Sequence, residues 1–86
     1  MHTVELLEQA IDLASRLGYH VRHEWLGGTG GGGCELRGRK TLFLDLALGP
    51  ADQLDLAIEA LRHEPDAVSL PMPAELRDLL AVRKSA

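Results

Sequence analysis

The stretch from Leu26 to Asp45 reads LGGTGGGGCELRGRKTLFLD, and its folding decides the fold of the chain. Six of the seven residues in Gly27–Gly33 are glycine. Beyond them, apolar and polar side chains alternate over residues 34–37 and again over 41–48. Alternation with a period of two is typical of strands. The sequence therefore predicts an antiparallel strand pair, turning at residues 38–40, that follows a glycine-rich connection.

The apolar pattern selects a register for this strand pair. Leucines occupy the even positions over 42–48, so these positions face the core and the odd ones face away. A three-residue turn over 38–40 places Leu36 and Cys34 on the leucine face, whereas a two-residue turn over 38–39 places both on the other face. We therefore expect the three-residue turn, with Cys34 in the core.

The rest of the chain supplies helices and one more strand. Apolar residues at three- and four-residue spacing predict amphipathic helices, and Gly18 and Pro65 are typical of helix ends. The expected elements are a helix over 3–17, a strand over 19–26, the strand pair, a helix over 50–64, an optional short edge strand over 67–70 and a helix over 73–82. The predicted fold is α+β, with the order α-β-β-β-α-(β)-α. It is a three-stranded antiparallel meander with helices on one face, in a single small domain over residues 1–86.

Length and composition limit the classes of protein to consider. The chain has 86 residues, of which 45% are hydrophobic and 3% aromatic, so its core is small and aliphatic. No apolar run reaches the roughly 20 residues of a membrane span, and a single cysteine excludes an internal disulfide framework. We expect a cytoplasmic protein that does not bind membranes, and a homodimer that completes the small core.

Charge is unevenly distributed along the chain. The net charge is −4, but residues 16–40 carry five basic and two acidic side chains, against four basic and eleven acidic elsewhere. An acidic whole argues against nucleic-acid binding, whereas a basic middle segment suits an acidic partner or a small anion.

The outward face of the sheet is the predicted interaction site. It carries polar residues on the strand over 19–26 and an outward aromatic side chain in the last strand. The side chains expected to bind are Arg22, Arg37, Arg39, Lys40 and Phe43. We expect a non-catalytic protein-interaction or regulatory module that binds a protein partner or itself.

Two phosphate-binding patterns are incomplete. Residues 28–33 satisfy G-x-G-x-x-G, but a strand follows where a dinucleotide site needs a helix. Residues 33–41 have one residue too many for a P-loop. The glycine run is expected to be a mobile hairpin connection in which residues 29–32 are replaceable. The alternative is a small anionic ligand bound at Gly27, Gly28, Gly30 and Gly33.

A thiol or metal protein is a further alternative. Cys34 and His23 share the expected core face, but two ligands are fewer than the three or four that zinc needs. His20 points to the opposite face of its strand. No complete catalytic motif is present, so we expect no enzyme activity, no metal and no cofactor.

Two resemblances complete the sequence evidence. Residues 27–80, which include GGGCELRGRKTLFLD and the closing PAELR, resemble small bacterial proteins that share a G-G-x-C segment and a strand pair. That resemblance implies a fold and no activity. The segment LFLDLALGPADQLDLAIEALRH is similar in rhythm to the ImmA/IrrE-type zinc metallopeptidases. Glu59 matches the general base of that family, but Ile58 and Arg62 occupy its two histidine positions. The similarity therefore implies a non-catalytic relative without zinc.

Overall fold

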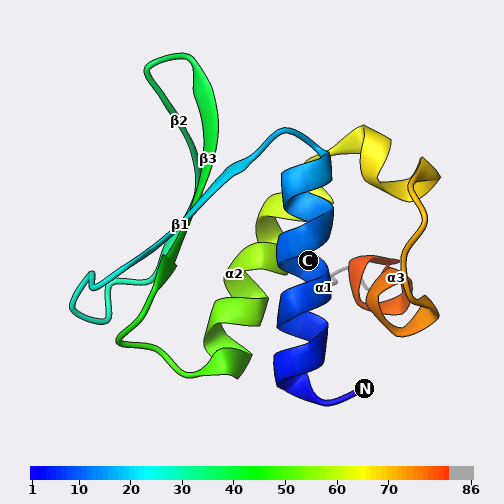
Figure 1. Ribbon diagram of the computed structural model, residues 1–86, viewed down its shortest axis with the longest axis horizontal. Coiled ribbons are helices and arrows are strands. Elements are labelled where there is room, and N and C mark those ends of the chain that lie inside the picture. Colours follow the sequence, from blue (N-terminus) through cyan, green and yellow to red (C-terminus); the bar gives the residue numbers. More distant parts are fainter. Residues whose placement is uncertain (82–86) are drawn as a thin grey trace, which may run out of the picture.

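A computed structural model describes residues 1–81 of the chain (Figure 1). The elements, in chain order, are α1 (Thr3–Arg16), β1 (His20–Glu24), β2 (Gly31–Leu36), β3 (Arg39–Asp45), α2 (Pro50–Arg62), the 3-10 helix η1 (Pro65–Ser69) and α3 (Ala74–Ala81). The α+β class is confirmed. The optional strand over 67–70 is wrong, because residues 67–69 belong to η1 and Leu70 caps that helix. Val82 of the predicted last helix lies outside the described residues.

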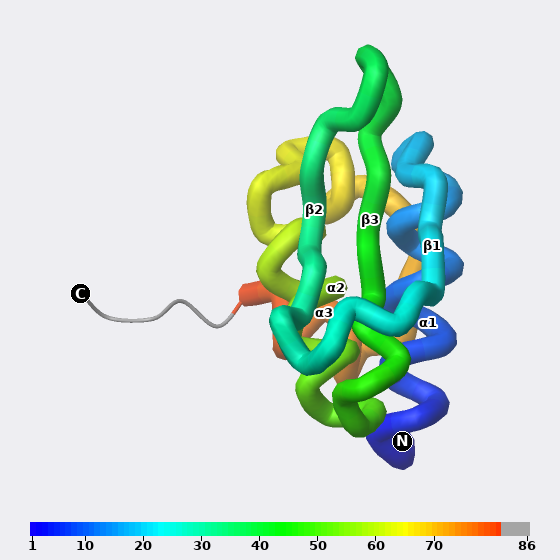
Figure 2. The backbone as a smooth tube through the Cα atoms, turned by 90° about the vertical axis from the view of Figure 1, so that its left-hand side faces the viewer, coloured from blue at the N-terminus to red at the C-terminus, as the bar shows by residue number. Residues whose placement is uncertain are grey.

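The sheet is mixed, and the predicted antiparallel meander is wrong. Its strand order is β1-β3-β2, with β1 parallel to β3 and β2 antiparallel to β3. Consecutive strands β1 and β2 are therefore not neighbours, and the last strand lies between them. The chain leaves β1 and crosses the end of β3 to begin β2, and we call residues 25–30 the crossing loop (Figure 2).

Helices cover one face of this sheet. Both α1 and α2 lie behind the strands in Figure 2, and α3 packs beyond them. Gly49 precedes α2, and Pro50 begins it at the predicted position. The predicted core residues Leu42, Leu44, Ile58 and Leu61 are all buried. The other buried hydrophobic residues are Leu6, Leu7, Ala10, Leu13, Ala14, Leu54, Ala57, Ala60, Ala67 and Leu76.

The hairpin turn differs from both turns that the sequence analysis considered. It is a two-residue turn at Arg37 and Gly38, whose φ angles are 53° and 77°. Positive φ at both positions matches the twist of the strands on either side. The turn pairs Leu36 with Arg39 and therefore shifts the expected register.

The shifted register moves two residues out of the core. Cys34 pairs with Thr41 and faces away from the helices, and Leu36 is 44% exposed. Both predictions of burial were wrong. Gly33, which has no side chain, takes the place opposite Leu42. A Cβ on Gly33 would lie 3.1 Å from the Cβ of Ala60, so glycine lets α2 approach the sheet closely.

Candidate interaction surface

One buried carboxylate organises the crossing loop. Asp45, the last residue of β3, has no exposed surface. Its carboxylate accepts backbone N–H bonds from Leu26 (3.0 Å), Gly28 (2.7 Å), Gly30 (3.1 Å) and Ala47 (2.8 Å). Three of these donors belong to the crossing loop. A loop that runs over the end of a strand has no strand partner, so its N–H groups need another acceptor.

The hydrogen bonds also change the acidity of this group. Burial alone would raise the pKa of Asp45, but the four backbone N–H groups favour the charged form and outweigh burial. The pKa is lowered below its ordinary value as a result. Asp45 is therefore an anion that the chain itself supplies to its glycine loop.

This arrangement corrects the expectation of a hairpin connection whose residues 29–32 are replaceable. Gly30 is buried and bonded to Asp45. A Cβ on Gly31 would lie 2.6 Å from the carbonyl oxygen of Phe43. The connection joins strands that are not paired with each other, so it is not a hairpin. The N–H groups of Gly28 and Gly30, which an external anion would need, already bind the carboxylate.

The face of the sheet that carries no helix is the outer face. Paired residues point to the same side of a sheet, so the register assigns its members. They are His20, Arg22, Glu24, Gly32, Cys34, Leu36, Arg39, Thr41, Phe43 and Asp45. Three of the five predicted binding residues therefore share this face, and Arg37 lies at the hairpin tip beside them.

A basic groove runs along the hairpin end of the outer face. Its volume is about 340 Å³. It is lined by His20, Arg22, Leu36, Arg37, Arg39 and Thr41. Arg22 lies with its guanidinium carbon 5.7 Å from the ring centre of Phe43, and it also forms an ion pair with Glu24 at 2.6 Å. The stacking explains why the outward Phe43 is half-buried.

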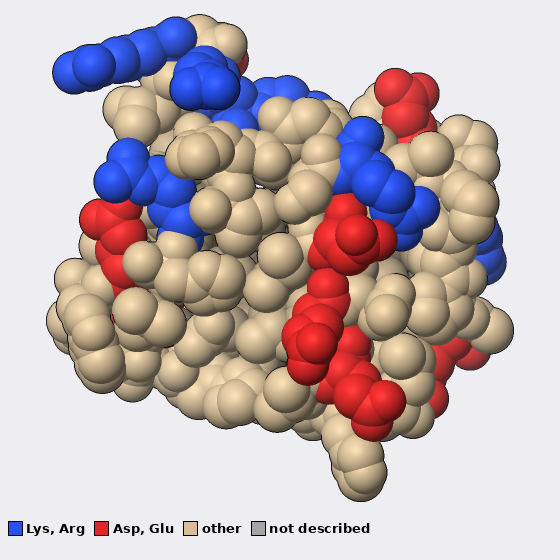
Figure 3. Space-filling view, viewed as in Figure 1, with Lys and Arg blue, Asp and Glu red and all other residues tan. Residues whose placement is uncertain are grey.

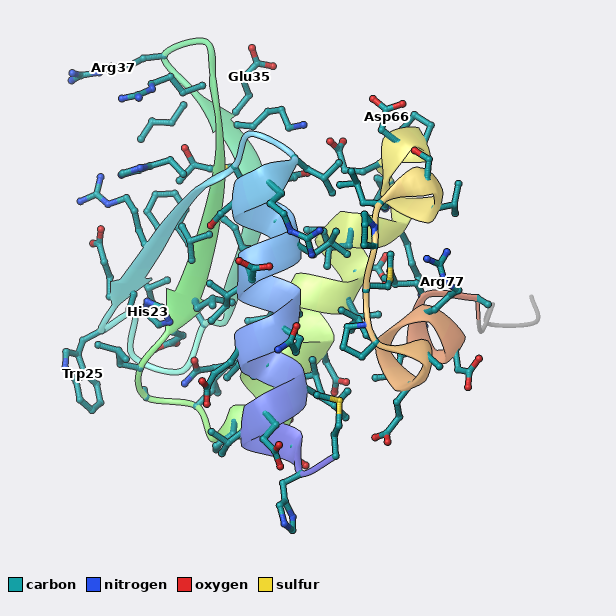
Figure 4. The ribbon with its side chains drawn as sticks, turned by 45° about the vertical axis from the view of Figure 1, so that its right-hand side comes forward. His23, Trp25, Glu35, Arg37, Asp66 and Arg77 are labelled. Carbon is teal, nitrogen blue, oxygen red and sulfur yellow. The ribbon has the colours of Figure 1, made fainter. Side chains whose placement is uncertain are left out.

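Trp25 extends the outer face at its other end, and sequence reasoning missed it. The alternation over 19–26 had placed it on the core face with His23. In the structure β1 ends at Glu24, and Trp25 begins the crossing loop with 74% of its surface exposed. Figure 4 shows Trp25 and Arg37 at opposite ends of the sheet, both pointing away from the helices. Exposed tryptophan and arginine are typical of interface residues.

Lys40 does not belong to the outer face, contrary to the prediction. It shares the face of Leu42, and its Nζ donates to the carbonyl oxygen of Leu17 at 2.9 Å and to the carboxylate of Glu64. The same atom lies 4.7 Å from the ring centre of Tyr19. The hydrogen bond to Glu64 raises the pKa of Lys40. Lys40 thus fixes the sheet to the end of α2 and is not free to bind a partner.

A second groove lies on the helix side, along the free edge of β2. We call it the edge groove, and its volume is about 490 Å³. Residues 31–35 of β2 form one wall, and Leu56 and Ala60 of α2 form the other. The lining also includes Tyr19, Lys40, Glu59, His63 and Glu64. Glu35 belongs to this side of the sheet and not to the outer face, as Figure 4 also shows, because the register is shifted.

The structure separates the residues of the thiol or metal alternative. Cys34 lies on β2 and His23 on β1, with β3 between them, and they face opposite sides of the sheet. His20 shares the rung and the face of Cys34, but two strand spacings amount to about 10 Å. Within residues 1–81, no group of three or more His, Cys, Asp or Glu side chains could hold a metal ion. Glu59 is paired with Arg62 at 3.7 Å.

The chain was compared with protein-family models, curated proteins and solved structures. No family model, curated protein or solved structure matches this chain. Over residues 1–81, no helix has the length and apolar character needed to cross a membrane.

Proposed function

We propose that this chain is a protein-interaction module whose outer face binds an acidic, extended segment of a partner protein. One observation supports the proposal most strongly. The helices cover one face of the sheet, and the uncovered face carries Arg22 and Arg39, with Arg37 beside them at the hairpin tip. Arg37 and Arg39 are exposed, and no ion pair of either side chain is found within residues 1–81. Free guanidinium groups are suited to bidentate binding of carboxylates.

The charge distribution supports an acidic partner. Figure 3 shows basic side chains gathered at the hairpin end of the sheet, and acidic side chains along α1. The basic groove adds Leu36, which is 44% exposed, to its cationic side chains. An extended segment that alternates acidic and apolar residues presents all of its acidic side chains on one side, and that side suits the arginines of the groove.

The only tryptophan of the chain makes a direct test practical. Trp25 lies at the edge of the outer face and is largely exposed, so its fluorescence should report an occupant. The probe is an eight-residue peptide that alternates glutamate and valine, with a lysine-valine peptide as its matched opposite. We expect the glutamate peptide to bind with a dissociation constant below ~1 mM, and the lysine peptide not to bind. Added salt should weaken the binding.

A charge-matched pair of variants locates the binding. The double variant Arg37→Gln/Arg39→Gln removes two positive charges from the groove and should weaken binding about tenfold, since exposed ion pairs contribute up to ~1 kcal/mol each. Ala51→Glu/Ala74→Glu makes the same change in net charge at exposed positions of α2 and α3. It should change the affinity less than about threefold.

Three results would overturn the proposal. The glutamate peptide fails to bind, or both double variants weaken it equally, or the groove prefers another polyanion. Single-stranded DNA and anionic phospholipid vesicles are therefore titrated in parallel. Tighter binding of either would identify a different class of partner.

A further inference from the structure

We propose that two copies of this chain associate through the free edge of β2, in antiparallel register, with Gly33 on the twofold axis. This surface differs from the outer face that the proposed function uses. Each proposal can therefore fail without the other.

The turn determines which backbone groups of β2 are free. In a two-residue hairpin, the residues on either side of the turn bond to each other, here Leu36 and Arg39. Bonded and non-bonded positions alternate along an antiparallel strand. Gly32 and Cys34 therefore bond to β3, whereas the odd residues 31, 33 and 35 direct their N–H and C=O groups to the free edge. Within residues 1–81, no backbone hydrogen bond from outside the sheet reaches these three residues.

The β2 edge has few of the features that prevent strand pairing. Proteins protect edge strands with charges, proline or a covering element. Residues 31–33 are all glycine, so no side chain keeps an approaching backbone away. Glu35 is the only charged residue of β2. The opposite edge, β1, carries Arg22 and Glu24.

The sequence of β2 is complementary to itself in the proposed register. With Gly33 opposite Gly33 of the second copy, each Glu35 lies opposite the second copy's Gly31. All three free residues on each strand then find hydrogen-bonding partners. The two glutamates lie four residues apart along the pair, so their like charges are well separated. A register with Cys34 on the axis would pair only residues 33 and 35 and would bring the two glutamates closer together.

The edge groove gives the second copy a surface to cover. Its α2 wall exposes Leu56, which is half-buried, next to the glycine strand. In each copy, α2 packs on β2. Antiparallel pairing of the two β2 strands therefore brings the second copy's α2 toward the groove. Six strands then form one continuous sheet, with both outer faces on the same side.

Amide hydrogen exchange, read residue by residue over a range of concentrations, tests the edge directly. In wild-type protein, the amides of Gly32 and Cys34 should be protected at every concentration, because they bond within the hairpin. Those of Gly31, Gly33 and Glu35 should gain at least tenfold protection only as the mass in sedimentation rises from 9.4 kDa to twice that value. An unchanged mass up to ~1 mM chain, or protection independent of concentration, would overturn the proposal.

A backbone variant with a matched control confirms the location. Glu35→Pro removes a donor that faces the free edge and no donor of the hairpin, so it should raise the dimer dissociation constant at least tenfold. Glu35→Gln keeps the backbone donor and should change it less than threefold. A folded Glu35→Pro variant that dimerises like the wild type would place the interface elsewhere. If that variant does not fold, the exchange pattern of the wild type decides.

Cys34 distinguishes the registers. With Gly33 on the axis, the two Cys34 residues are diagonal neighbours about 8 Å apart, which is too far for a disulfide. A short bis-maleimide should link the two thiols, each adding across one maleimide double bond, whereas diamide should not form the disulfide. Rapid disulfide formation with diamide would overturn the Gly33 register. Monomers that bind an added valine-rich peptide along β2 would overturn the choice of a second copy.

Discussion

The glycines in the two halves of the glycine run meet different physical demands. In residues 27–30, glycine allows a loop to curl around a carboxylate, with φ angles of 69°, 86° and 101° at its glycines. In residues 31–33, glycine allows a strand to lie against a neighbouring backbone and a helix. The first half needs unusual dihedral angles, and the second also needs the absence of a side chain. A run of one residue type is therefore not one structural feature.

The largest effect is expected where both demands coincide. Gly31 has a φ of 92°, and a Cβ there would lie 2.6 Å from the carbonyl oxygen of Phe43. We expect Gly31→Ala to lower the free energy of unfolding by about 4 kcal/mol, from backbone strain and overpacking together. Gly33→Ala should cost about 1 kcal/mol, because its only close contact is the Cβ of Ala60 at 3.1 Å. Urea unfolding measures both, and equal losses would contradict the distinction.

Removing the charge of Asp45 tests whether residues 27–30, the first half of the glycine run, depend on this carboxylate. Asp45→Asn cannot satisfy the loop N–H groups equally well, and we expect the melting temperature to fall on the order of 10 °C. Asp55→Asn, at an exposed position of α2, should shift it by less than about 2 °C. A similar shift in both variants would mean that the loop does not depend on the carboxylate.

The same residue predicts a dependence on pH. The folded pKa of Asp45 lies below its ordinary value of 3.8, so its stabilising effect is fully present above that value. It is lost as the pH falls through the folded pKa. Wild-type protein should therefore lose more stability than Asp45→Asn between about pH 4 and pH 2. Parallel stability curves for the two proteins over that range would contradict this assignment.

A smaller effect isolates dihedral strain from packing. Gly28 has a φ of 86°, and no atom lies within 4 Å of the position that a Cβ would take. Gly28→Ala should therefore lower the free energy of unfolding by only about 1–2 kcal/mol. Gly18, after α1, also has a positive φ and open space, and its alanine variant is the matched control. Thermal unfolding should give similar losses for both. A much larger loss of stability for Gly28→Ala than for Gly18→Ala would show that the loop is packed too tightly around Gly28 to accept a methyl group.

The smallest effect concerns the residue that follows the run. Because Cys34 is exposed, Cys34→Ser should change stability by less than ~0.5 kcal/mol. A thiol reagent should label the native protein at a rate close to that of the urea-unfolded chain. Slow native labelling would restore the buried position that the sequence pattern had favoured.

The sequence predicted the helices better than the sheet. The apolar stripes and the signals at Gly18, Gly49 and Pro50 are local, and local chemistry determines where helices begin and end. Strand pairing is not local. The parallel pairing of β1 with β3 joins residues 21 positions apart, as at His20 and Thr41, and no nearby residue signals it. The register depended on Arg37, a non-glycine residue with positive φ, which is uncommon.

The outer face was predictable only in part. Alternation along the strands correctly placed Arg22 and Phe43 on the outer face. Arg39 and Lys40 were both assigned to the turn, but they belong to β3, where Arg39 shares the outer face and Lys40 shares the parity of Leu42. It also failed for Trp25, because the alternation extends past the end of β1. The role of Asp45 could have been predicted from one feature of the sequence. A loop rich in unpaired N–H groups needs an acceptor, and Asp45 is the acidic residue that ends the last strand.

The strand order has a consequence for how the chain folds during synthesis. β3 is central in the sheet but is the last strand to leave the ribosome, so β1 and β2 have no pairing partner until β3 begins to emerge. The hairpin of β2 and β3 is local and can close within microseconds, whereas β1 must find its place beside a strand made later. Asp45 is the final residue of that strand. Its arrival supplies at once the end of the sheet and the acceptor for the loop that crosses it.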